Sequence, residues 1–427
     1  SKTIKVVIIG LLILLLMIPM FMIENLISER GRTQEEAIDE VSEKWSLAQT
    51  ITGPYLNLQY PVVTENNGEK KVSIKDLILF PDELMVNGQL KTEILKRSIY
   101  EVNVYQSELT LKGSFSSEEL KKSRIDMDQL QFDRAAICLN LTDMRGISEQ
   151  ISITLGDSVY IFEPGMDNRG IANTGVHAIA NLSELKQNKK LPYEIKIKLK
   201  GSQSLNFIPL GKTTRVDLKA NWNTPSFTGN YLPNNRNITE KEFSAQWQVL
   251  NLNRNYSQVM ADYNTSNIKD IENSSFGVNF KIPVEQYQQS MRSAKYAILI
   301  ILLTFGVIFF TEIMNKTRIH ALQYLLVGLA LCLFYSLLLS FSEHVGFNPA
   351  YLLSSALTII LVGGYMFGIT KKKKPSLIMS GLLGILYLYI FVLIQLETFA
   401  LLAGSLGLFI ILAMVMYFSK KIDWFNE

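Results

Sequence analysis

The sequence predicts an α+β membrane protein with six transmembrane helices and one large antiparallel, β-rich domain outside the membrane. Three observations lead to this fold class. An apolar run occupies residues 4–23, and residues 294–418 are almost entirely apolar. Between them, apolar and polar side chains alternate with a period of two, which is typical of strands with one buried face.

Six apolar segments are long enough to cross a bilayer, which takes about 20 residues. The first is 4–23, and the other five are 294–311, 322–341, 349–369, 376–396 and 398–418. We therefore expect an N-terminal transmembrane anchor at 1–23, a five-helix bundle at 294–418 and a cytoplasmic tail at 419–427. A cleaved signal peptide is the alternative for the first segment, but that segment offers no small-x-small cleavage site.

The basic residues predict that both termini are cytoplasmic. With six spans they gather on one side of the membrane, at Lys2, Lys5, Lys316, Arg318, Lys371, Lys372, Lys373, Lys374, Lys420 and Lys421. The short loops on the opposite side carry no Lys or Arg. By the positive-inside rule, residues 24–293 are periplasmic. Arg292 and Lys295 go against this bias, but a long translocated domain is moved largely regardless of its charges.

Residues 24–53 are expected to form an amphipathic stalk helix that continues from the first span. Ile38, Val41, Trp45 and Ala48 recur at three- and four-residue steps, which indicates one narrow apolar face. A Gly53-Pro54 pair is a typical stop signal, so we predict that the helix ends there.

Residues 54–293 are expected to form the β-rich domain. Residues 193–200 alternate without a fault, and similar runs surround Leu218, Trp247 and Val278. Turn signals such as Asn87-Gly88 separate the runs. Short strands at this spacing predict a sandwich or two stacked sheets, built as one domain or as two subdomains.

The sequence predicts no catalytic, cofactor-binding or metal-binding residues. His177, His320 and His344 are scattered over both sides of the membrane, whereas a metal needs clustered ligands. Cys138 lies in the outer domain and Cys332 in the third span, so no disulfide joins them. No phosphate-binding loop and no Gly-x-Ser-x-Gly elbow occur. A net charge of +3 gives no indication of nucleic-acid binding.

Charged residues at the outer rim of the bundle are the candidate contact between bundle and domain. A charge near hydrocarbon is costly and therefore needs a partner. We expect Glu343 or Glu397 to pair with Arg292 or Lys295, with His344 beside Glu343. Separate solvated charges are the alternative.

Motifs spread over nearly the whole chain resemble one known family. They include Glu29-Arg30, Gly53-Pro54, Phe80-Pro81-Asp82-Glu83-Leu84, Asp143-Met144-Arg145-Gly146-Ile147, Trp222-Asn223-Thr224-Pro225-Ser226-Phe227, Pro283-Val284-Glu285-Gln286-Tyr287 and the segment from Phe334 through Glu343-His344 to Phe347. In these motifs the chain resembles the CreD family of cell envelope integrity proteins. The resemblance implies a place in the inner membrane of Gram-negative bacteria and a role in envelope stress responses. It implies no catalytic residues.

These observations favour a protein that binds or scaffolds through its periplasmic domain and that is not an enzyme. Its expected partners are the lipid bilayer and an envelope protein or cell-wall component, with no cofactor and no nucleic acid. The alternative is a transporter or a membrane-embedded enzyme acting on lipid or cell-wall intermediates. Since no charged residue falls in the middle of a span, the first interpretation is favoured. The oligomeric state stays open.

Overall fold

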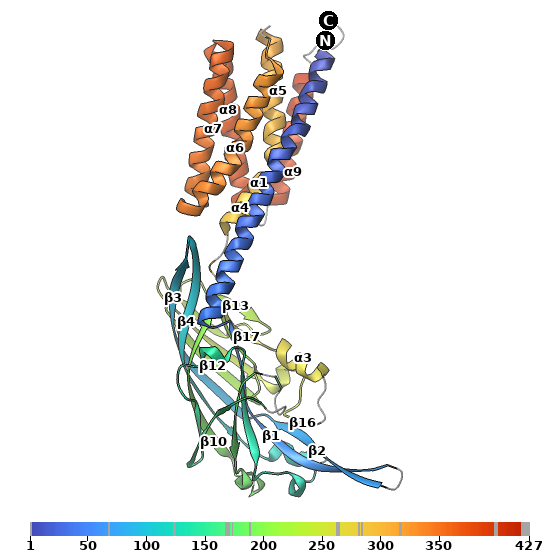
Figure 1. Cartoon of the computed structure of the whole chain (residues 1–427), viewed down its shortest axis with the longest axis vertical. Helices are drawn as coiled ribbons and strands as arrows, with labels where there is room; N and C mark the ends of the chain where they lie inside the picture. Colours follow the sequence, from blue (N-terminus) through green and yellow to red (C-terminus); the bar gives the residue numbers. More distant parts are fainter. Residues whose placement is uncertain are drawn as a thin grey trace. The chain divides into compact units, whose positions relative to one another are not determined.

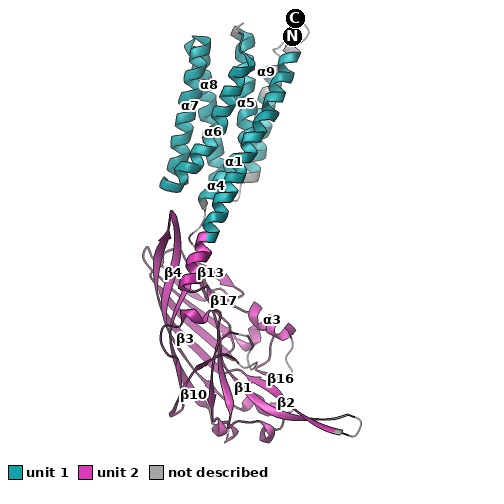
Figure 2. Cartoon of the chain, in the orientation of Figure 1, with its two compact units in different colours: residues 1–36, 283–427 teal, residues 37–282 magenta. Residues whose placement is uncertain are grey.

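The computed structural model forms two compact units (Figures 1 and 2). Unit 1 is Ser1–Glu36 with Pro283–Glu427, and unit 2 is Ala37–Ile282. The residues that the structure describes are 2–66, 69–122, 125–166, 171–172, 174–187, 189–261, 265–280, 282, 285–315, 318–396 and 400–419. Each unit has its own packing, so each is treated in turn.

Helix α1 (Lys2–Trp45) is a single helix whose residues belong to unit 1 up to Glu36 and to unit 2 from Ala37. The prediction that it ends at Gly53-Pro54 is wrong, because both residues lie inside strand β1 (Gln49–Asn66). The register between β1 and β5 (Ala135–Leu141) shifts between Thr52 and Tyr55, which marks a β-bulge. Gly53 has a φ of +134°, and a Cβ there would lie 2.9 Å from the Cys138 carbonyl oxygen. The Gly-Pro pair therefore bends a strand rather than ending a helix.

Unit 2 contains two sheets. The nine-stranded sheet has the order β13-β17-β11-β1-β5-β9-β8, with β2 paired to β1 and β16 paired to β2. The eight-stranded sheet has the order β14-β15-β12-β3-β4-β10-β6-β7. The remaining strands are β2 (Glu69–Leu79), β3 (Glu83–Arg97), β4 (Tyr100–Phe115), β6 (Ser152–Leu155), β7 (Ser158–Ile161), β8 (Glu163–Pro164), β9 (Val176–Ala180), β10 (Leu191–Ser202), β11 (Ser204–Phe207), β12 (Thr213–Ala220), β13 (Ser226–Gly229), β14 (Asn235–Ile238), β15 (Phe243–Leu250), β16 (Val259–Ala261) and β17 (Phe276–Asn279). Short helices α2 (Glu118–Lys122) and α3 (Thr265–Asn273) lie between strands.

One hydrophobic core joins the two sheets into a sandwich. Leu56 and Leu58 of β1 belong to the same buried cluster as Leu109 of β4 and Ile195 of β10. The alternation expected at 193–200 is confirmed, since the odd-numbered side chains of that stretch are buried. The expectation of an antiparallel domain holds for most of the strand pairs, such as β1 with β2 and β3 with β4. It fails for two pairs, because β1 pairs with β11, and β3 with β12, in parallel. These partners are far apart in the chain, so no local turn signal reveals their direction.

The helices of unit 1 after residue 283 are α4 (Glu285–Ala294), α5 (Ala297–Asn315), α6 (Ala321–Val345), α7 (Phe347–Thr370), α8 (Lys373–Gln395) and α9 (Ala400–Ser419). Within the described residues, α1, α5, α6, α7 and α8 are long and apolar enough to cross a membrane, and α9 contributes a shorter apolar stretch, Leu402–Met414. Residues 283–293, grouped with the outer domain from the sequence, differ from that expectation: they fall in unit 1, where α4 contacts α6, α7 and α8.

The amino-terminal helix packs within unit 1. Leu16 and Met20 of α1 are buried. Leu16 lies against Gly328 of α6, where a Cβ would also come within 3.0 Å of the Phe305 ring of α5. A small residue at this position lets the backbones of α1 and α6 approach closely, as is common in membrane helix pairs.

Candidate functional site

A polar groove of about 240 Å³ opens in unit 2 beside β1 and β5. Its lining residues include six with hydroxyl or amide side chains, namely Thr50, Thr52, Asn140, Thr142, Thr174 and Ser275. The other lining residues are apolar, such as Ile208 and Ile271, apart from Glu272. Ligand sites commonly combine an apolar surface with a few placed polar groups in this way.

Asn140 builds one wall of the groove. Its side-chain amide nitrogen donates to the carbonyl oxygens of Ala172 (3.0 Å) and Thr174 (2.8 Å). Its side-chain oxygen accepts a 2.6 Å hydrogen bond from the Tyr55 hydroxyl, which in turn accepts from the Ile171 amide at 2.8 Å. Because Tyr55 is completely buried, this network holds the wall in place before any ligand arrives.

The chemistry of the groove favours an uncharged polar ligand. Hydroxyl groups both donate and accept hydrogen bonds. Among its described lining residues, Glu272 is the one charged side chain, and none is His, Cys, Lys or Arg. Among these described lining residues, none therefore offers a positive charge to a phosphate.

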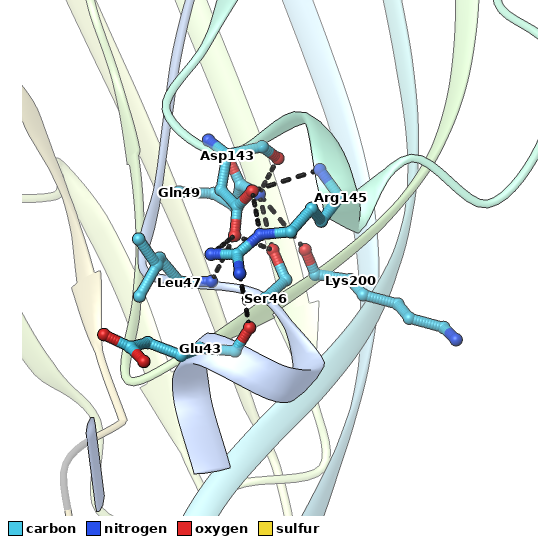
Figure 3. Close-up of polar contacts among 7 residues, drawn as sticks. All are labelled: Glu43, Ser46, Leu47, Gln49, Asp143, Arg145 and Lys200. Carbon is cyan, nitrogen blue, oxygen red and sulfur yellow. Dashed lines mark hydrogen bonds and ion pairs between the residues drawn. The ribbon is translucent and has the colours of Figure 1, made fainter. Parts of the chain in front are cut away.

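A second polar cluster holds the end of α1 to the sandwich (Figure 3). The Asp143 carboxylate accepts from the Leu47 amide at 2.9 Å and from the Ser46 hydroxyl at 3.3 Å. Arg145 donates to the same carboxylate at 2.9 and 3.0 Å, and to the Glu43 carbonyl oxygen in the last turn of α1 at 2.6 Å. A cation at a helix C-terminus is favourable both as a donor and against the helix dipole.

The environment of Asp143 stabilises its ionised form. Burial opposes ionisation, but the hydrogen bonds from Arg145 and from the Leu47 amide outweigh it and hold the pKa of Asp143 below its ordinary value. Gly146 closes the turn, since a Cβ there would meet the Lys200 carbonyl and lie 2.7 Å from the Ser46 hydroxyl. The motif at residues 143–147 therefore has a structural role, and we call these residues with Ser46, Leu47 and Gln49 the helix-end clamp.

The predicted rim residue Glu343 finds partners other than the expected ones. Its carboxylate accepts a 2.9 Å hydrogen bond from the Tyr287 hydroxyl of α4 and lies 3.8 Å from Nε of Arg30 on α1. All three residues belong to unit 1, so this contact joins helices within that unit. Among the described residues, neither Arg292 nor Lys295 forms an ion pair with Glu343, and both are exposed.

Of the other two rim candidates, the structure describes His344 alone, and it lies apart from the Glu343 contacts. His344 is exposed, and its Nδ1 lies 3.0 Å from the Ser340 carbonyl oxygen of its own helix. Glu397 lies outside the described residues. The sequence did not predict Arg30 and Tyr287 as partners of Glu343, because these three residues come from distant segments of the chain. The available signal was that all three lie in the motifs that carry the family resemblance.

A third polar cluster lies where α1 begins and α5 ends. Lys5 forms an ion pair with Glu312 and donates to the Ile319 carbonyl oxygen at 2.8 Å. The Tyr324 hydroxyl donates to the same carboxylate at 3.2 Å. Glu312 follows the predicted second span, 294–311, so the sequence analysis puts it on the same side of the membrane as Lys5, and the two side chains are in contact.

Across the parts of the chain that the structure describes, no group of three or more His, Cys, Asp or Glu side chains could hold a metal ion. Cys138 and Cys332 are both buried and free, so neither forms a disulfide.

Comparison with known proteins agrees with the resemblance seen in the motifs. The family model described as inner membrane protein CreD matches residues 1–425. The chain is 32% identical over 420 residues to the inner membrane protein CreD of Escherichia coli (strain K12). The matched region covers 97% of this chain and 91% of the relative. The family description places such proteins in the inner membrane and names no enzymatic activity. This chain is an inner-membrane protein of the CreD family.

Proposed function

We propose that this protein supports cell envelope integrity by binding an uncharged polar segment of an envelope partner in the groove of unit 2. The observation that carries the proposal is the groove itself, with its six hydroxyl and amide side chains and its pre-positioned Asn140 wall. Sugar and peptide groups of the cell wall, or a loop of an envelope protein, have the donors and acceptors that such a lining requires. Binding and scaffolding need no catalytic group.

The proposed topology is six spans with both termini cytoplasmic and residues 24–293 periplasmic. The contact of Lys5 with Glu312 supports it, since it joins the start of α1 to the end of α5 as expected when both lie on one side. Helix α9, with 20 residues, is the proposed sixth span. We propose bilayer lipid as the partner of an apolar cavity of about 410 Å³ lined by α5, α8 and α9, including Gly306, Tyr389 and Gly407.

Cysteine labelling in intact cells tests the topology. Leu252 in unit 2 is 87% exposed, and Lys371 lies exposed after α7. In a background lacking the two native cysteines, a membrane-impermeant maleimide should label Leu252→Cys at once. It should label Lys371→Cys only after permeabilisation. The reverse order would contradict the proposed orientation.

Site-specific photocrosslinking tests the binding function. A photoreactive residue at Thr174, which is exposed at the groove, should capture a discrete partner in cells. The same residue at Asn87, exposed on β3, is the matched control and should not. Ala172→Trp fills the groove and should abolish capture from Thr174. Capture that is equal at both sites, or that persists with Ala172→Trp, would contradict groove binding.

The alternative function, transport or membrane-embedded catalysis on lipid or cell-wall intermediates, predicts a different capture. A photoreactive residue at His344 would then collect lipid-linked material at the outer end of α6. Capture there with none at Thr174 would move the working site from the groove to the bundle.

A further inference from the structure

The apolar cavity of about 410 Å³ in unit 1 lies between α5, α8 and α9, which are three of the proposed spans. Its described lining residues are all Leu, Ile, Val, Met, Phe, Tyr or Gly. The hydroxyl of the lining residue Tyr389 donates to the Ala403 carbonyl oxygen of α9 at 2.9 Å and is thereby satisfied. The described side chains around the cavity therefore offer a guest apolar contacts and no unpaired hydroxyl or amide group.

Gly306 of α5 keeps part of this space open. A Cβ at this position would lie more than 4 Å from every described atom beyond the adjoining α5 backbone. In another protein, an apolar cavity of about 150 Å³ binds benzene. A cavity of about 410 Å³ therefore has room for a longer hydrocarbon, such as a lipid acyl chain.

The cavity is open toward the outside of the bundle. Leu302 of α5, Ile385 of α8 and Ile410 of α9 line it and are 49%, 69% and 50% exposed. In a transmembrane helix, exposed apolar side chains face lipid, whose chains are as apolar as leucine. A chain from the surrounding bilayer can therefore enter the cavity from the side.

One end of the cavity points toward the start of α8. The contact of Tyr389 with Ala403 joins the second half of α8 to the beginning of α9, so these two helices are antiparallel. The start of α8 consequently lies at the end of the bundle where α9 terminates, beyond the lining residue Met414.

This end of the bundle is strongly basic. Residues 371–374 are four lysines, and all four are exposed. Lys373 and Lys374 belong to the first turn of α8, which contains no acidic residue and where positive charge opposes the helix dipole. Basic clusters next to a span attract anionic lipid headgroups, which would compensate this charge.

The distance between the lysines and the cavity fits one lipid molecule. Leu382, the first residue of α8 to line the cavity, follows Lys374 by eight residues. Eight residues of α-helix span about 12 Å. The hydrocarbon of one leaflet is about 15 Å thick, so a phosphate at Lys374 leaves its acyl chain at the depth of the cavity.

We propose that the cavity binds an anionic phospholipid of the cytoplasmic leaflet. One acyl chain lies between α5, α8 and α9, and the phosphate lies at Lys373 and Lys374. This inference rests on the proposed topology, which places the start of α8 on the cytoplasmic side, and it narrows the proposed lipid partner to one class. A zwitterionic lipid has no net charge and gains less from the lysines, so the site discriminates between headgroups.

Photoaffinity labelling of the purified full chain in lipid nanodiscs tests the proposal. The probe is phosphatidylglycerol with a diazirine near the middle of one acyl chain, at low mole fraction in phosphatidylcholine. Phosphatidylcholine with the same diazirine chain is the matched probe. The α8 peptide that contains Leu382 and Ile385 should be labelled severalfold more strongly by the phosphatidylglycerol probe. Equal labelling by the two probes would overturn the proposal.

Two glycine variants distinguish the cavity from the ordinary lipid-facing surface. Gly306→Leu fills the cavity and should remove the excess labelling by phosphatidylglycerol. Gly364→Leu on α7 is the matched control, because a Cβ there also meets no described atom within 4 Å but Gly364 does not line the cavity. Excess labelling that persists in Gly306→Leu, or that both variants abolish equally, would show that the chain does not lie in the cavity.

Charge variants test the headgroup position without filling the cavity. Lys373→Gln combined with Lys374→Gln should reduce labelling by phosphatidylglycerol to the phosphatidylcholine level. The corresponding pair of arginine substitutions keeps the charge and should keep the excess. If the glutamine pair also keeps it, the proposal fails. These results depend neither on the groove of unit 2 nor on the direction of insertion, so an incorrect topology would appear instead in the cysteine labelling of Lys371→Cys.

Discussion

The helix-end clamp allows a quantitative prediction, because Asp143 serves several donors at once. Asp143→Ala leaves the Leu47 amide and the Ser46 hydroxyl without their acceptor. The Asp143 side chain is only 7% exposed, whereas that of Arg145 is 56% exposed and can turn to water. An unsatisfied buried donor costs about 1–3 kcal/mol, which gives about 2–6 kcal/mol for two such groups. Because Leu47 is itself partly open to solvent, we expect the lower part of this range, about 2–4 kcal/mol of destabilisation.

Tryptophan fluorescence is a suitable assay, because Trp45, Trp222 and Trp247 all lie in unit 2. For a unit of this size, 1 kcal/mol shifts the Tm by about 2–4 °C, which predicts a fall of about 4–16 °C for Asp143→Ala. The control is Glu149→Ala, which removes an exposed ion pair to Lys198 at 2.8 Å and should change the Tm little. Equal shifts for the two variants would refute the assignment of Asp143 as the clamp.

Three further predictions follow from the same contacts. Gly146→Ala inserts a Cβ against the Lys200 carbonyl and should destabilise unit 2 by about 1–3 kcal/mol in the same assay, and an unchanged Tm would show that the turn can relax. The pKa of Asp143 is depressed in the folded state, so its contribution to stability is present above the ordinary carboxyl pKa and is lost as the pH falls. The Tm of the wild type should therefore exceed that of Asp143→Asn by less and less below about pH 4. A Tm difference that stays constant with pH would contradict this prediction. In unit 1, a double-mutant cycle of Tyr287→Phe with Glu343→Gln should give a coupling of about 0.5–1.5 kcal/mol by thermal stability in detergent, whereas additive effects would show that this hydrogen bond contributes nothing.

Local sequence patterns predicted the structure best where apolar and polar residues alternate regularly along a strand. The alternation at residues 193–200 predicted one buried face, and β10 has it, because neighbouring side chains on a strand point to opposite faces. Local signals failed at Gly53-Pro54, since the same pair serves a helix end or a β-bulge, and only the pairing of β1 with β5 decides which. They also failed for the parallel partners of β1 and β3, whose contacts join distant segments.

The candidate site shows the same division. Glu343 could be singled out from the sequence, because an acidic residue at the end of an apolar span is costly without a partner. The partners of Glu343 could not be identified from the sequence. The pattern of apolar and charged residues places charges along one helix but does not show which helices are in contact. Arg30 and Tyr287 reach Glu343 only through the packing of α1 and α4 beside α6. The groove of unit 2 gave no sequence signal, since threonine and serine on strands are ordinary surface residues.

The class of this protein follows from its amino-acid sequence: apolar spans, a β-rich domain between them, and membership of its family through motifs that are contiguous in the chain. Hydropathy and period carry such information because each residue contributes to it independently. Only the packing of the folded chain shows that Asp143 holds the end of α1 and that Asn140 forms the groove wall. Those assignments depend on which distant side chains come within hydrogen-bonding distance, and that is a property of the packed chain.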